Sequence, residues 1–290
     1  MKCITCLCIV LAVLFYCVTG DDIQEEIEEY SSGSRIIGGR DAYPGEVPFQ
    51  VSIQRKYYFG NGSFHWCGGT IIDSEHIITA AHCLSGIPVE ELIVFAGVLN
   101  KTWQSSESTK VVRNVTQVFL HEDFVYEKYL NDIAIMKVSP AFPEDNSALQ
   151  PMQLRKEEAP LGLNCTTSGW GLLDSEEYPD ILQIVSVPYI PEDECRQIYE
   201  LNNYTENEIY PGMTCAGYEQ GGKDACAGDS GGPLQCGGLL TGIVSWGAGC
   251  AEPNYPGVYA DVVYYKEWIA TQLAKSRIKP LSIPVQHITS

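Results

Sequence analysis

Short apolar runs alternate with turn-forming residues along most of the chain. Between residues 36 and 259 the runs are rich in β-branched and aromatic residues: FQVSIQ, TIIDSEHIIT, LIVFAGV, VVRNVTQVFL, DIAIMKV, ILQIVSVPYI and LLTGIVSWG. Runs of this length and spacing are typical of an all-β barrel or sandwich. In residues 264–276 the apolar positions instead recur at helical spacing, so we expect one helix near the C-terminus.

The first 35 residues follow a different pattern. Residues 1–20 carry Lys2, then a mostly apolar run, then small residues, which indicates a secretory signal peptide. A membrane anchor is the disfavoured alternative, because the run is short for a bilayer. Residues 21–35 hold six acids and one arginine, a composition typical of a solvated, protease-accessible segment.

The remaining boundaries follow from changes in composition. Residues 139–150 contain two Pro and one Asn and are the best candidate for a junction between two halves of the domain. After the predicted helix, residues 277–290 are expected to form a loose tail. We therefore expect one large domain over residues 36–276.

Charge restricts the partners of this chain. The formal net charge is -19, which argues against nucleic acid and favours cationic peptides. Solubility alone is the alternative explanation of the acidity. No later stretch is long and apolar enough to span a bilayer, so we expect no membrane partner.

Eight cysteines lie after the predicted signal peptide. An even number in an exported chain implies disulfides, although spacing alone cannot choose the pairing. Export also agrees with five candidate N-glycosylation sites, of which we expect only some to be used. The candidate asparagines are Asn61, Asn100, Asn114, Asn164 and Asn203.

Three segments supply the residues for nucleophilic chemistry. In KDACAGDSGGP (residues 223–233), Ser230 is flanked by glycines and follows Asp224 by six positions. TAAHC contributes His82, and NDIAIMK contributes Asp132. Each alone could be a core histidine, a strand-end aspartate or a serine in a glycine turn. Together they form the set that acyl transfer requires.

Nine motifs occur in an order that is specific to one family. They are IIGG after an arginine, WCGGTII, TAAHC, NDIAIMK, SGWG, CAGY, GDSGGP, GIVSWG and PGVY. Over residues 36–276 the chain resembles the trypsin-like serine proteases of the chymotrypsin fold. The resemblance implies two packed six-stranded antiparallel β-barrels with a C-terminal helix, and an active site in the cleft between the barrels.

The resemblance also assigns roles to the motif residues. It implies that Ser230 is the nucleophile, that His82 is its general base, and that Asp132 orients the imidazole. The backbone N–H groups of Gly228 and Ser230 correspond to the oxyanion hole. The segment Ser245, Trp246 and Gly247 is similar to the edge that pairs with an extended substrate.

Asp224 matches the position at the base of a specificity pocket. Gly247 and Gly257 flank it and leave the pocket open, so the resemblance implies cleavage after Arg or Lys. A structural ion pair is the alternative role for Asp224. Ala225 stands where many trypsins have serine, and the missing hydroxyl predicts a modest preference for arginine.

The junction between Arg35 and Ile36 is similar to an activation site. Residues 21–35 would be an acidic activation peptide, and cleavage would free an α-amine on Ile36 that pairs with Asp229. The intact chain would therefore be a zymogen. Because Arg35 itself suits a pocket with Asp224 at its base, self-activation is a further hypothesis.

The family pattern implies four disulfides: Cys67 with Cys83, Cys165 with Cys236, Cys195 with Cys215, and Cys226 with Cys250. Several trypsins carry a calcium loop in the region of VLNKTWQSSEST. Here Val98 stands at the first expected ligand and Glu107 is the only acid, so we expect no metal or cofactor. We expect His65, His76 and His121 to be surface or structural residues.

These observations indicate a secreted serine endopeptidase, made as a zymogen and acting in digestion, since no recruitment module is recognised before the catalytic domain. The alternatives are a regulatory or defence protease with a narrow target, and a binding protein on a catalytically dead scaffold. The intact His82, Asp132, Ser230 and Asp224 argue against the dead scaffold. Expected partners are protein or peptide substrates with Arg or Lys at the cleavage site and protein protease inhibitors, with the enzyme acting as a monomer.

Overall fold

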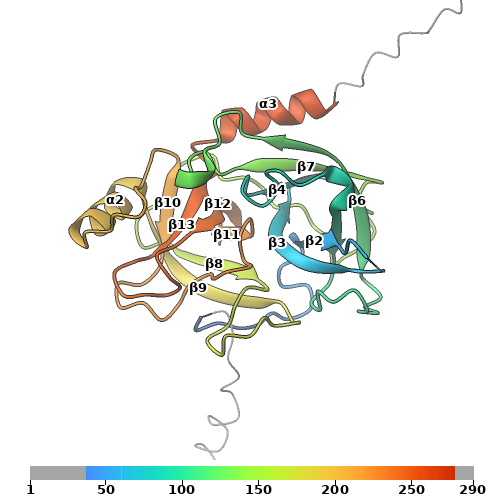
Figure 1. The fold of residues 1–290 in the computed structure, drawn as a ribbon, viewed down its shortest axis with the longest axis horizontal. Coiled ribbons are helices and arrows are strands. Elements are labelled where there is room, and N and C mark those ends of the chain that lie inside the picture. The colour runs from blue at the N-terminus through green and yellow to red at the C-terminus, as the bar shows by residue number, and fades with distance from the viewer. Residues whose placement is uncertain (1–36, 60, 278–290) are drawn as a thin grey trace, which may run out of the picture. The chain divides into compact units, whose positions relative to one another are not determined.

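Two antiparallel sheets close on themselves in the computed structural model, which describes residues 37–59 and 61–277 (Figure 1). The first barrel has the strand order β2-β3-β4-β7-β6-β5. Its strands are β2 (Gln50–Lys56), β3 (Ser63–Ile71), β4 (His76–Thr79), β5 (Leu92–Ala96), β6 (Val111–Leu120) and β7 (Ala134–Ser139).

The second barrel has the order β9-β10-β13-β12-β11-β8 and is closed by pairing between β8 and β9. One further strand of two residues, β1 (Arg40–Asp41), pairs antiparallel with β9. The barrel strands are β8 (Asn164–Gly169), β9 (Gln183–Ile190), β10 (Met213–Ala216), β11 (Pro233–Cys236), β12 (Leu239–Trp246) and β13 (Gly257–Asp261). The predicted all-β fold of two six-stranded barrels is confirmed.

Helices are few and short in the described residues. The expected C-terminal helix is present as α3 (Lys266–Arg277), two residues later at its start than predicted. Two 3-10 turns, η1 (Val89–Glu91) and η2 (Tyr126–Lys128), lie in loops. The sequence did not predict α2 (Glu192–Leu201), whose ten residues are mostly polar and bury only Cys195 and Tyr199.

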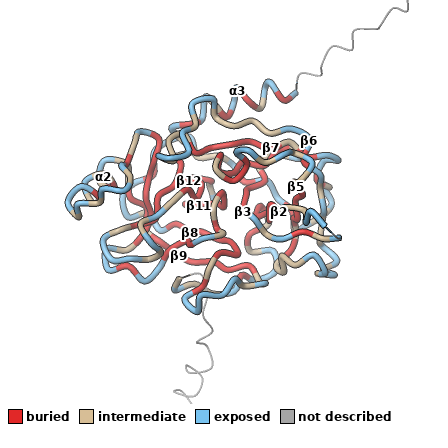
Figure 2. The backbone as a smooth tube through the Cα atoms, in the orientation of Figure 1, coloured by how far each residue is buried: buried red, intermediate tan, exposed pale blue. Residues whose placement is uncertain are grey.

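The barrels are filled by alternate side chains of their strands. Ile53, Phe95 and Ile135 are fully buried in the first barrel, and Tyr259 is fully buried in the second. Figure 2 shows mostly buried segments along β2, β5 and β7, with many exposed residues in the loops. The strand side chains that point inward form the rigid core of each barrel. The surface loops that connect the strands can therefore carry the residues of the site.

Helix α3 packs back onto the first barrel. His76 on β4 lies with Nε2 2.7 Å from Ser276 Oγ, and its Nδ1 donates to Asp73 Oδ1 over 2.7 Å. Lys137 Nζ on β7 donates to the Ser276 carbonyl over 3.1 Å. The side chain of His76 thus has a structural role, as the sequence suggested.

Four disulfides link the described residues, and they join the pairs that the family resemblance implies. Cys67 and Cys83 connect β3 to the loop that carries His82, while Cys226 and Cys250 connect two loops of the second barrel. A cross-link of this kind stabilises the fold mainly by restricting the unfolded chain.

The candidate glycosylation sites differ in accessibility. Asn61, Asn114, Asn164 and Asn203 are exposed. Asn100 is half-buried, and its side-chain oxygen accepts bonds from the N–H and hydroxyl of Thr102 at 2.9 and 2.6 Å. Glycosylation of these sites remains a prediction, with Asn100 the least accessible.

The loop between β5 and β6 is held together by an ammonium and a carboxylate. Lys110 Nζ donates to the carbonyls of Thr102, Trp103 and Ser105 at 3.2, 3.0 and 3.3 Å. Glu107 accepts from the N–H groups of Leu99 and Asn100. Burial lowers the pKa of Lys110. Converging carbonyls usually bind a metal ion, and here an internal cation satisfies them.

We predict that this loop does not depend on calcium. A chelator should leave the melting temperature unchanged, whereas Lys110→Met should remove the charged hydrogen bonds and destabilise the fold by about 1–2 kcal/mol. For a domain of this size, that loss lowers the melting temperature by about 2–8 °C. Lys156→Met, at an exposed lysine, is the matched control. A chelator-induced drop in the wild-type melting temperature would contradict the prediction.

Candidate functional site

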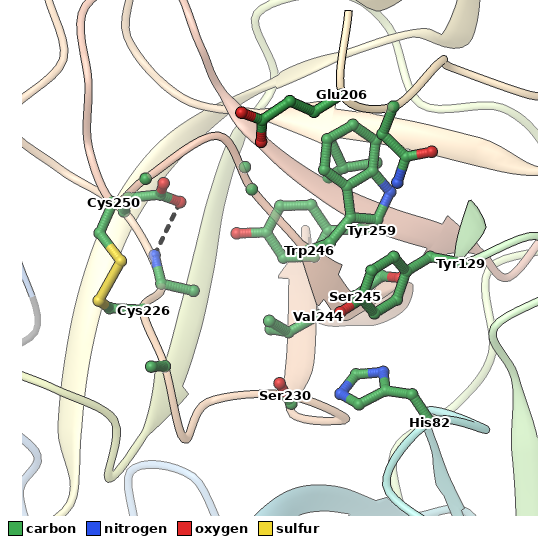
Figure 3. Close-up of a pocket in the computed structure, with 18 of the residues that line it drawn as sticks. His82, Tyr129, Glu206, Cys226, Ser230, Val244, Ser245, Trp246, Cys250 and Tyr259 are labelled. Carbon is green, nitrogen blue, oxygen red and sulfur yellow. Dashed lines mark hydrogen bonds between the residues drawn. A yellow bond between two sulfur atoms is a disulfide. The ribbon is translucent and has the colours of Figure 1, made fainter. Parts of the chain in front are cut away.

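A cavity of about 460 Å³ contains most of the residues that the motifs single out. His82 and Ser230 lie close together at one end of it, and Trp246 and Glu206 lie toward the other (Figure 3). Asp224 lines the same cavity. Residues from loops of both barrels therefore meet in one concave site, as sequence analysis expected.

His82 is oriented by a buried carboxylate. It follows β4 through the fully buried Ala80 and Ala81, and its own N–H donates to Asp132 Oδ1 over 2.8 Å. The ring donates from Nδ1 to Asp132 Oδ2 over 2.7 Å. Because Nδ1 carries this hydrogen, Nε2 is left as the nitrogen that can accept a proton.

Asp132 receives a third hydrogen bond from the other barrel. Ser245 Oγ, on β12, donates to Asp132 Oδ2 over 2.6 Å. Asp132 is only 1% exposed, so these three donors replace the water that it would otherwise bind. Sequence analysis assigned Ser245 only to substrate pairing, and its contact with Asp132 is an additional finding.

Ser230 sits in a turn that only glycine can complete. Gly228 has φ +98° and Gly231 has φ +77°, in the region that other residues rarely adopt. A Cβ on Gly231 would lie 2.1 Å from Thr79 Oγ1, so the turn packs directly on the first barrel. Figure 3 shows the Ser230 hydroxyl and the His82 ring facing the same space. The two side chains are not hydrogen-bonded to each other in this structure.

The N–H groups of Gly228 and Ser230 donate to no described residue. Their neighbours are fixed: Asp229 N–H donates to the Cys226 carbonyl over 2.9 Å, and Gly231 N–H donates to the Val244 carbonyl over 2.8 Å. Two free donors in a rigid turn are a suitable site for a developing negative charge.

His65 supports this turn, and sequence analysis did not assign it a site role. Its Nε2 donates to the Gly228 carbonyl over 2.9 Å, and Nδ1 lies 2.7 Å from the hydroxyl of Ser52. Burial lowers the pKa of His65 to about 4, so the ring stays neutral near neutral pH. His65 lies two residues before Cys67 on β3. Nothing in the sequence around His65 indicates that it would bind Ser52 and Gly228.

Asp229 is completely buried beneath the turn. Its carboxylate accepts from Gly171 N–H over 2.7 Å and from Cys226 N–H over 2.9 Å. Burial outweighs these bonds and raises the pKa of Asp229 to about 6. The predicted partner amine on Ile36, and the junction with Arg35, lie outside the described residues.

Asp224 lines the cavity and is only 3% exposed. It accepts from Ala225 N–H over 2.8 Å and from Ala251 N–H over 3.1 Å. No Lys or Arg among the described residues forms an ion pair with it, which disfavours the structural alternative for this residue. Burial raises the pKa of Asp224 to about 7.

Glycines keep the approach to Asp224 open. A Cβ on Gly257 would lie 2.4 Å from Asp224 Oδ1, and one on Gly247 would lie 3.1 Å from the Gly249 carbonyl. Ala225, with its small side chain, also lines the cavity. The result is a narrow slot with a carboxylate at its end, which suits a long side chain with a cationic tip.

Aromatic and acidic residues form the outer part of the cavity. Trp246 stacks near Tyr129 and Tyr204, with ring centroids 6.5 and 6.1 Å apart. Glu127 and Glu206 line the same region. Trp246 belongs to the segment that sequence analysis assigned to substrate pairing, whereas Glu127 and Glu206 lie in loops that carry no family motif.

One cluster in the described part of the chain has the donor atoms of a metal site. Cys67, His82 and Cys83 are the one group there with the spacing of a metal site, but the two cysteines form a disulfide and offer no thiolate. In residues 37–59 and 61–277, every helix is too short or too polar to cross a membrane.

Known proteins match almost the whole of this arrangement. The family model described as Trypsin matches residues 36–269. "Trypsin eta" of Drosophila melanogaster is 40% identical over 243 residues, covering 83% of this chain and 89% of the fly protein. "Trypsin-1" of Astacus astacus is 40% identical over 242 residues, covering 81% of this chain and 98% of the crayfish protein. "Serine proteinase stubble" of Drosophila melanogaster is 36% identical over 244 residues, which is 31% of that protein.

The raised pKa of Asp224 predicts how a small cation binds in the slot. Benzamidine, which carries an amidinium, should bind only the ionised carboxylate, so affinity should rise as pH increases through about 7. The expected gain is about tenfold between pH 6 and pH 8, measured by calorimetry. Asp224→Asn should bind benzamidine weakly at every pH, because the carboxylate that pairs with the amidinium is absent. His82 and Asp229 still titrate in this variant, so it also shows whether they contribute to the pH dependence. A wild-type affinity that is flat over this range would refute the prediction.

Proposed function

Because the chain belongs to the trypsin family of serine proteases, we propose that it hydrolyses peptide bonds after Arg or Lys through Ser230, His82 and Asp132. One observation carries this proposal: Asp132 holds His82 at Nδ1, and the other edge of the imidazole faces the space that Ser230 shares. A nucleophile, a base and an orienting carboxylate are thereby present in one cavity.

The proposed steps are those of the family's serine triad. Ser230 Oγ attacks the scissile carbonyl carbon while His82 Nε2 takes the hydroxyl proton. The carbonyl oxygen becomes negative and accepts from the N–H groups of Gly228 and Ser230. His82 then returns the proton to the leaving amine, and an acyl group stays on Ser230. Water, deprotonated by His82, attacks the acyl carbon and releases the acid.

Asp132 stabilises the imidazolium that forms in each half of this sequence. Its three hydrogen bonds keep it fixed, so no reorganisation is needed when the charge develops on His82. His65 would not contact the substrate. It would position the oxyanion hole by donating a hydrogen bond to the carbonyl of Gly228.

Specificity would come from Asp224. A guanidinium or ammonium that enters the slot pairs with the buried carboxylate of Asp224. This pairing offsets the unfavourable free energy of burying an unpaired carboxylate, and so favours binding of a basic side chain. Arginine can pair with a carboxylate through two parallel N–H groups, whereas a lysine ammonium would need another acceptor, which Ala225 cannot offer. A modest preference for arginine follows.

The proposal extends to synthesis as a zymogen. Asp229 has two N–H donors and forms no ion pair among the described residues, and burial raises its pKa although the charge of Lys101 acts in the opposite direction. A free α-amine at Ile36, released by cleavage after Arg35, has the charge that would stabilise it. The ion pair between this amine and the ionised carboxylate of Asp229 would then fix the conformation of the turn that carries Ser230.

A digestive role is the proposed physiological setting. Its support is the set of relatives named trypsins, which match this chain over most of their own length. With the predicted signal peptide, this setting implies secretion, protein substrates and restraint by protein protease inhibitors. A profile of the peptides released from a complex protein mixture distinguishes broad digestion from a narrow target.

The central test is substitution of the nucleophile. After activation, Ser230→Ala should lower kcat for an arginyl ester by about a million-fold, since the hydroxyl that forms the acyl-enzyme is absent. The same change should prevent labelling by an organophosphate. Ser108→Ala, at an exposed serine outside the cavity, is the control. Retention of ester turnover in Ser230→Ala would exclude the proposed mechanism.

A second test addresses the zymogen. Purified precursor should be inactive, and should gain activity together with a new N-terminus at Ile36. Arg35→Gln should stay inactive under the same incubation, because the junction no longer suits a pocket selective for Arg or Lys. Sequencing of the N-terminus and ester hydrolysis are the readouts. Activity in uncleaved Arg35→Gln protein is incompatible with this activation step.

A further inference from the structure

Exposed aromatic side chains gather at the loop between β2 and β3. Tyr57, Tyr58 and Phe59 directly follow the last residue of β2 and are 52%, 82% and 94% exposed. Trp103, in the loop between β5 and β6, is 42% exposed. All four residues lie outside the cavity that contains Asp224. An apolar surface of this kind commonly marks a site that another group covers, and we call Tyr57, Phe59 and Trp103 the loop aromatic surface.

Two rings of the loop aromatic surface meet at Gly62. A Cβ built on Gly62 would lie 3.4 Å from Tyr57 Cε2 and 3.6 Å from Trp103 Cγ. Tyr57 N–H donates to the Gly62 carbonyl over 3.2 Å, which closes the loop. The Tyr57 ring is also held near Phe64, with ring centroids 5.5 Å apart. The rings of Tyr57 and Trp103 therefore lie close to Asn61, the residue before Gly62.

The charged side chains that precede this loop already have partners. Arg55 forms an ion pair with Glu91 over 2.8 Å, and Lys56 Nζ donates to the Glu90 carbonyl over 2.8 Å. Residues 57–62 themselves carry no charge, in a chain whose net charge is -19. The loop aromatic surface therefore suits a neutral group, whereas an anionic lipid surface would need free basic side chains.

Asn61 can supply such a neutral group at this place. With Gly62 and Ser63 it forms an N-glycosylation triplet, and Asn61 is exposed. An N-acetylhexosamine has polar groups at its edge and C–H bonds on one face, and those C–H bonds pack against the electron-rich face of an aromatic ring. Asn61 follows Phe59 by two positions, so a sugar on its amide begins within reach of the loop aromatic surface.

The other candidate glycosylation sites differ from Asn61. Asn100 is half-buried, and its side-chain oxygen already accepts two hydrogen bonds. No aromatic residue lies within four positions of Asn114 or Asn164 in the sequence. Asn203 is followed by an aromatic residue, but that ring already stacks in the outer part of the main cavity. Asn61 is therefore the candidate beside which exposed aromatic surface is available to a sugar.

We propose that Asn61 carries an N-linked oligosaccharide whose first sugar packs on Tyr57, Phe59 and Trp103. The sugar covers the loop aromatic surface and connects the loop between β2 and β3 to the loop between β5 and β6. This inference goes beyond the proposed protease function and depends only on the export that residues 1–20 predict. The sugar then stabilises the fold in addition to its usual solubilising effect.

The sugar is attached before this part of the chain folds. The Asn61 amide nitrogen attacks the anomeric carbon of an oligosaccharide linked to a lipid pyrophosphate. A C–N bond forms, the bond from that carbon to the pyrophosphate oxygen breaks, and the lipid pyrophosphate leaves with the electron pair while the nitrogen gives up one proton. In the folded chain Ser63 is only 6% exposed, and its hydroxyl donates to Gln54 Oε1. The complete triplet is thus accessible to a transferase only in the unfolded chain, during export.

Both the occupancy of Asn61 and its effect on stability can be measured. The full chain with Ser230→Ala, a safeguard against self-digestion, is secreted from a eukaryotic host, and glycopeptide mass spectrometry reports which asparagines carry sugar. Asn61 should be occupied. Asn61→Gln should lower the melting temperature by about 2–4 °C, as expected for loss of a contact that partly buries aromatic rings. Asn164→Gln, at the exposed site without an aromatic residue nearby in sequence, is the matched control and should leave the melting temperature unchanged.

A double-mutant cycle tests whether the rings are the partner of the sugar. Phe59 is 94% exposed, so its side chain contributes little to the protein fold itself. Phe59→Ala should therefore lower the melting temperature by about 2 °C in the glycosylated chain and leave it unchanged in Asn61→Gln. Trp103→Ala should show the same difference, added to the loss of its own packing near Phe95. Tyr43→Ala, at a tyrosine that is 66% exposed, is the control and should have equal effects in both backgrounds.

Three results would overturn the inference. One is a secreted chain in which Asn61 carries no sugar. Another is an occupied Asn61 with Phe59→Ala lowering the melting temperature equally in the presence and absence of the sugar. The third is binding of the glycosylated chain to phosphatidylserine vesicles that Phe59→Ala abolishes, because the rings would then contact a membrane instead of the sugar. Ester hydrolysis after activation tests the protease function separately, so failure of one proposal leaves the other standing.

Discussion

The carboxylate of Asp132 joins the two barrels at the point where the site is built. It receives two hydrogen bonds from His82, which follows a strand of the first barrel, and one from Ser245 on a strand of the second. A buried carboxylate that lost one of these donors would leave a charge without compensation. The relative position of the barrels is therefore coupled to the orientation of the imidazole.

Two other buried aspartates are left in a less satisfied state. Asp224 and Asp229 each accept two backbone N–H bonds, and burial still raises the pKa of each. Because their pKa values lie above that of the unfolded chain, ionisation weakens the fold as pH rises through about 6 to 7. A cation would remove this penalty. A loss of stability of this kind is common at functional sites, where buried charge is retained for binding.

Sequence patterns predicted the larger part of the fold and site for identifiable reasons. The apolar runs of β5 and β7 signal buried strands directly, and the motifs around His82, Asp132 and Ser230 carry the site. Strands β8, β10 and β11 (NCTTSG, MTCA and PLQC) are short and rich in small or polar residues, so no run marks them. Helix α2 was missed because its mostly polar sequence buries only two residues.

Contacts between distant residues could not be predicted. His65 binds Ser52 and Gly228, which lie 13 and 163 residues away in sequence. Nothing in the local sequence of His65 indicates these partners. A cavity of about 440 Å³ likewise brings Trp66 of β3 together with Tyr178 and Gly228 from loops in the other half of the chain, and its volume depends on packing rather than on a motif.

The ammonium of Lys110 has a consequence for the conditions under which the loop between β5 and β6 persists. A bound ion stabilises a protein only in proportion to its concentration above the dissociation constant. A cation attached to the chain cannot be diluted away, and its effective concentration is set by the length of the side chain. We therefore expect the order of this loop not to vary with the concentration of a dissolved divalent cation, because the positive charge that its carbonyls bind belongs to the chain.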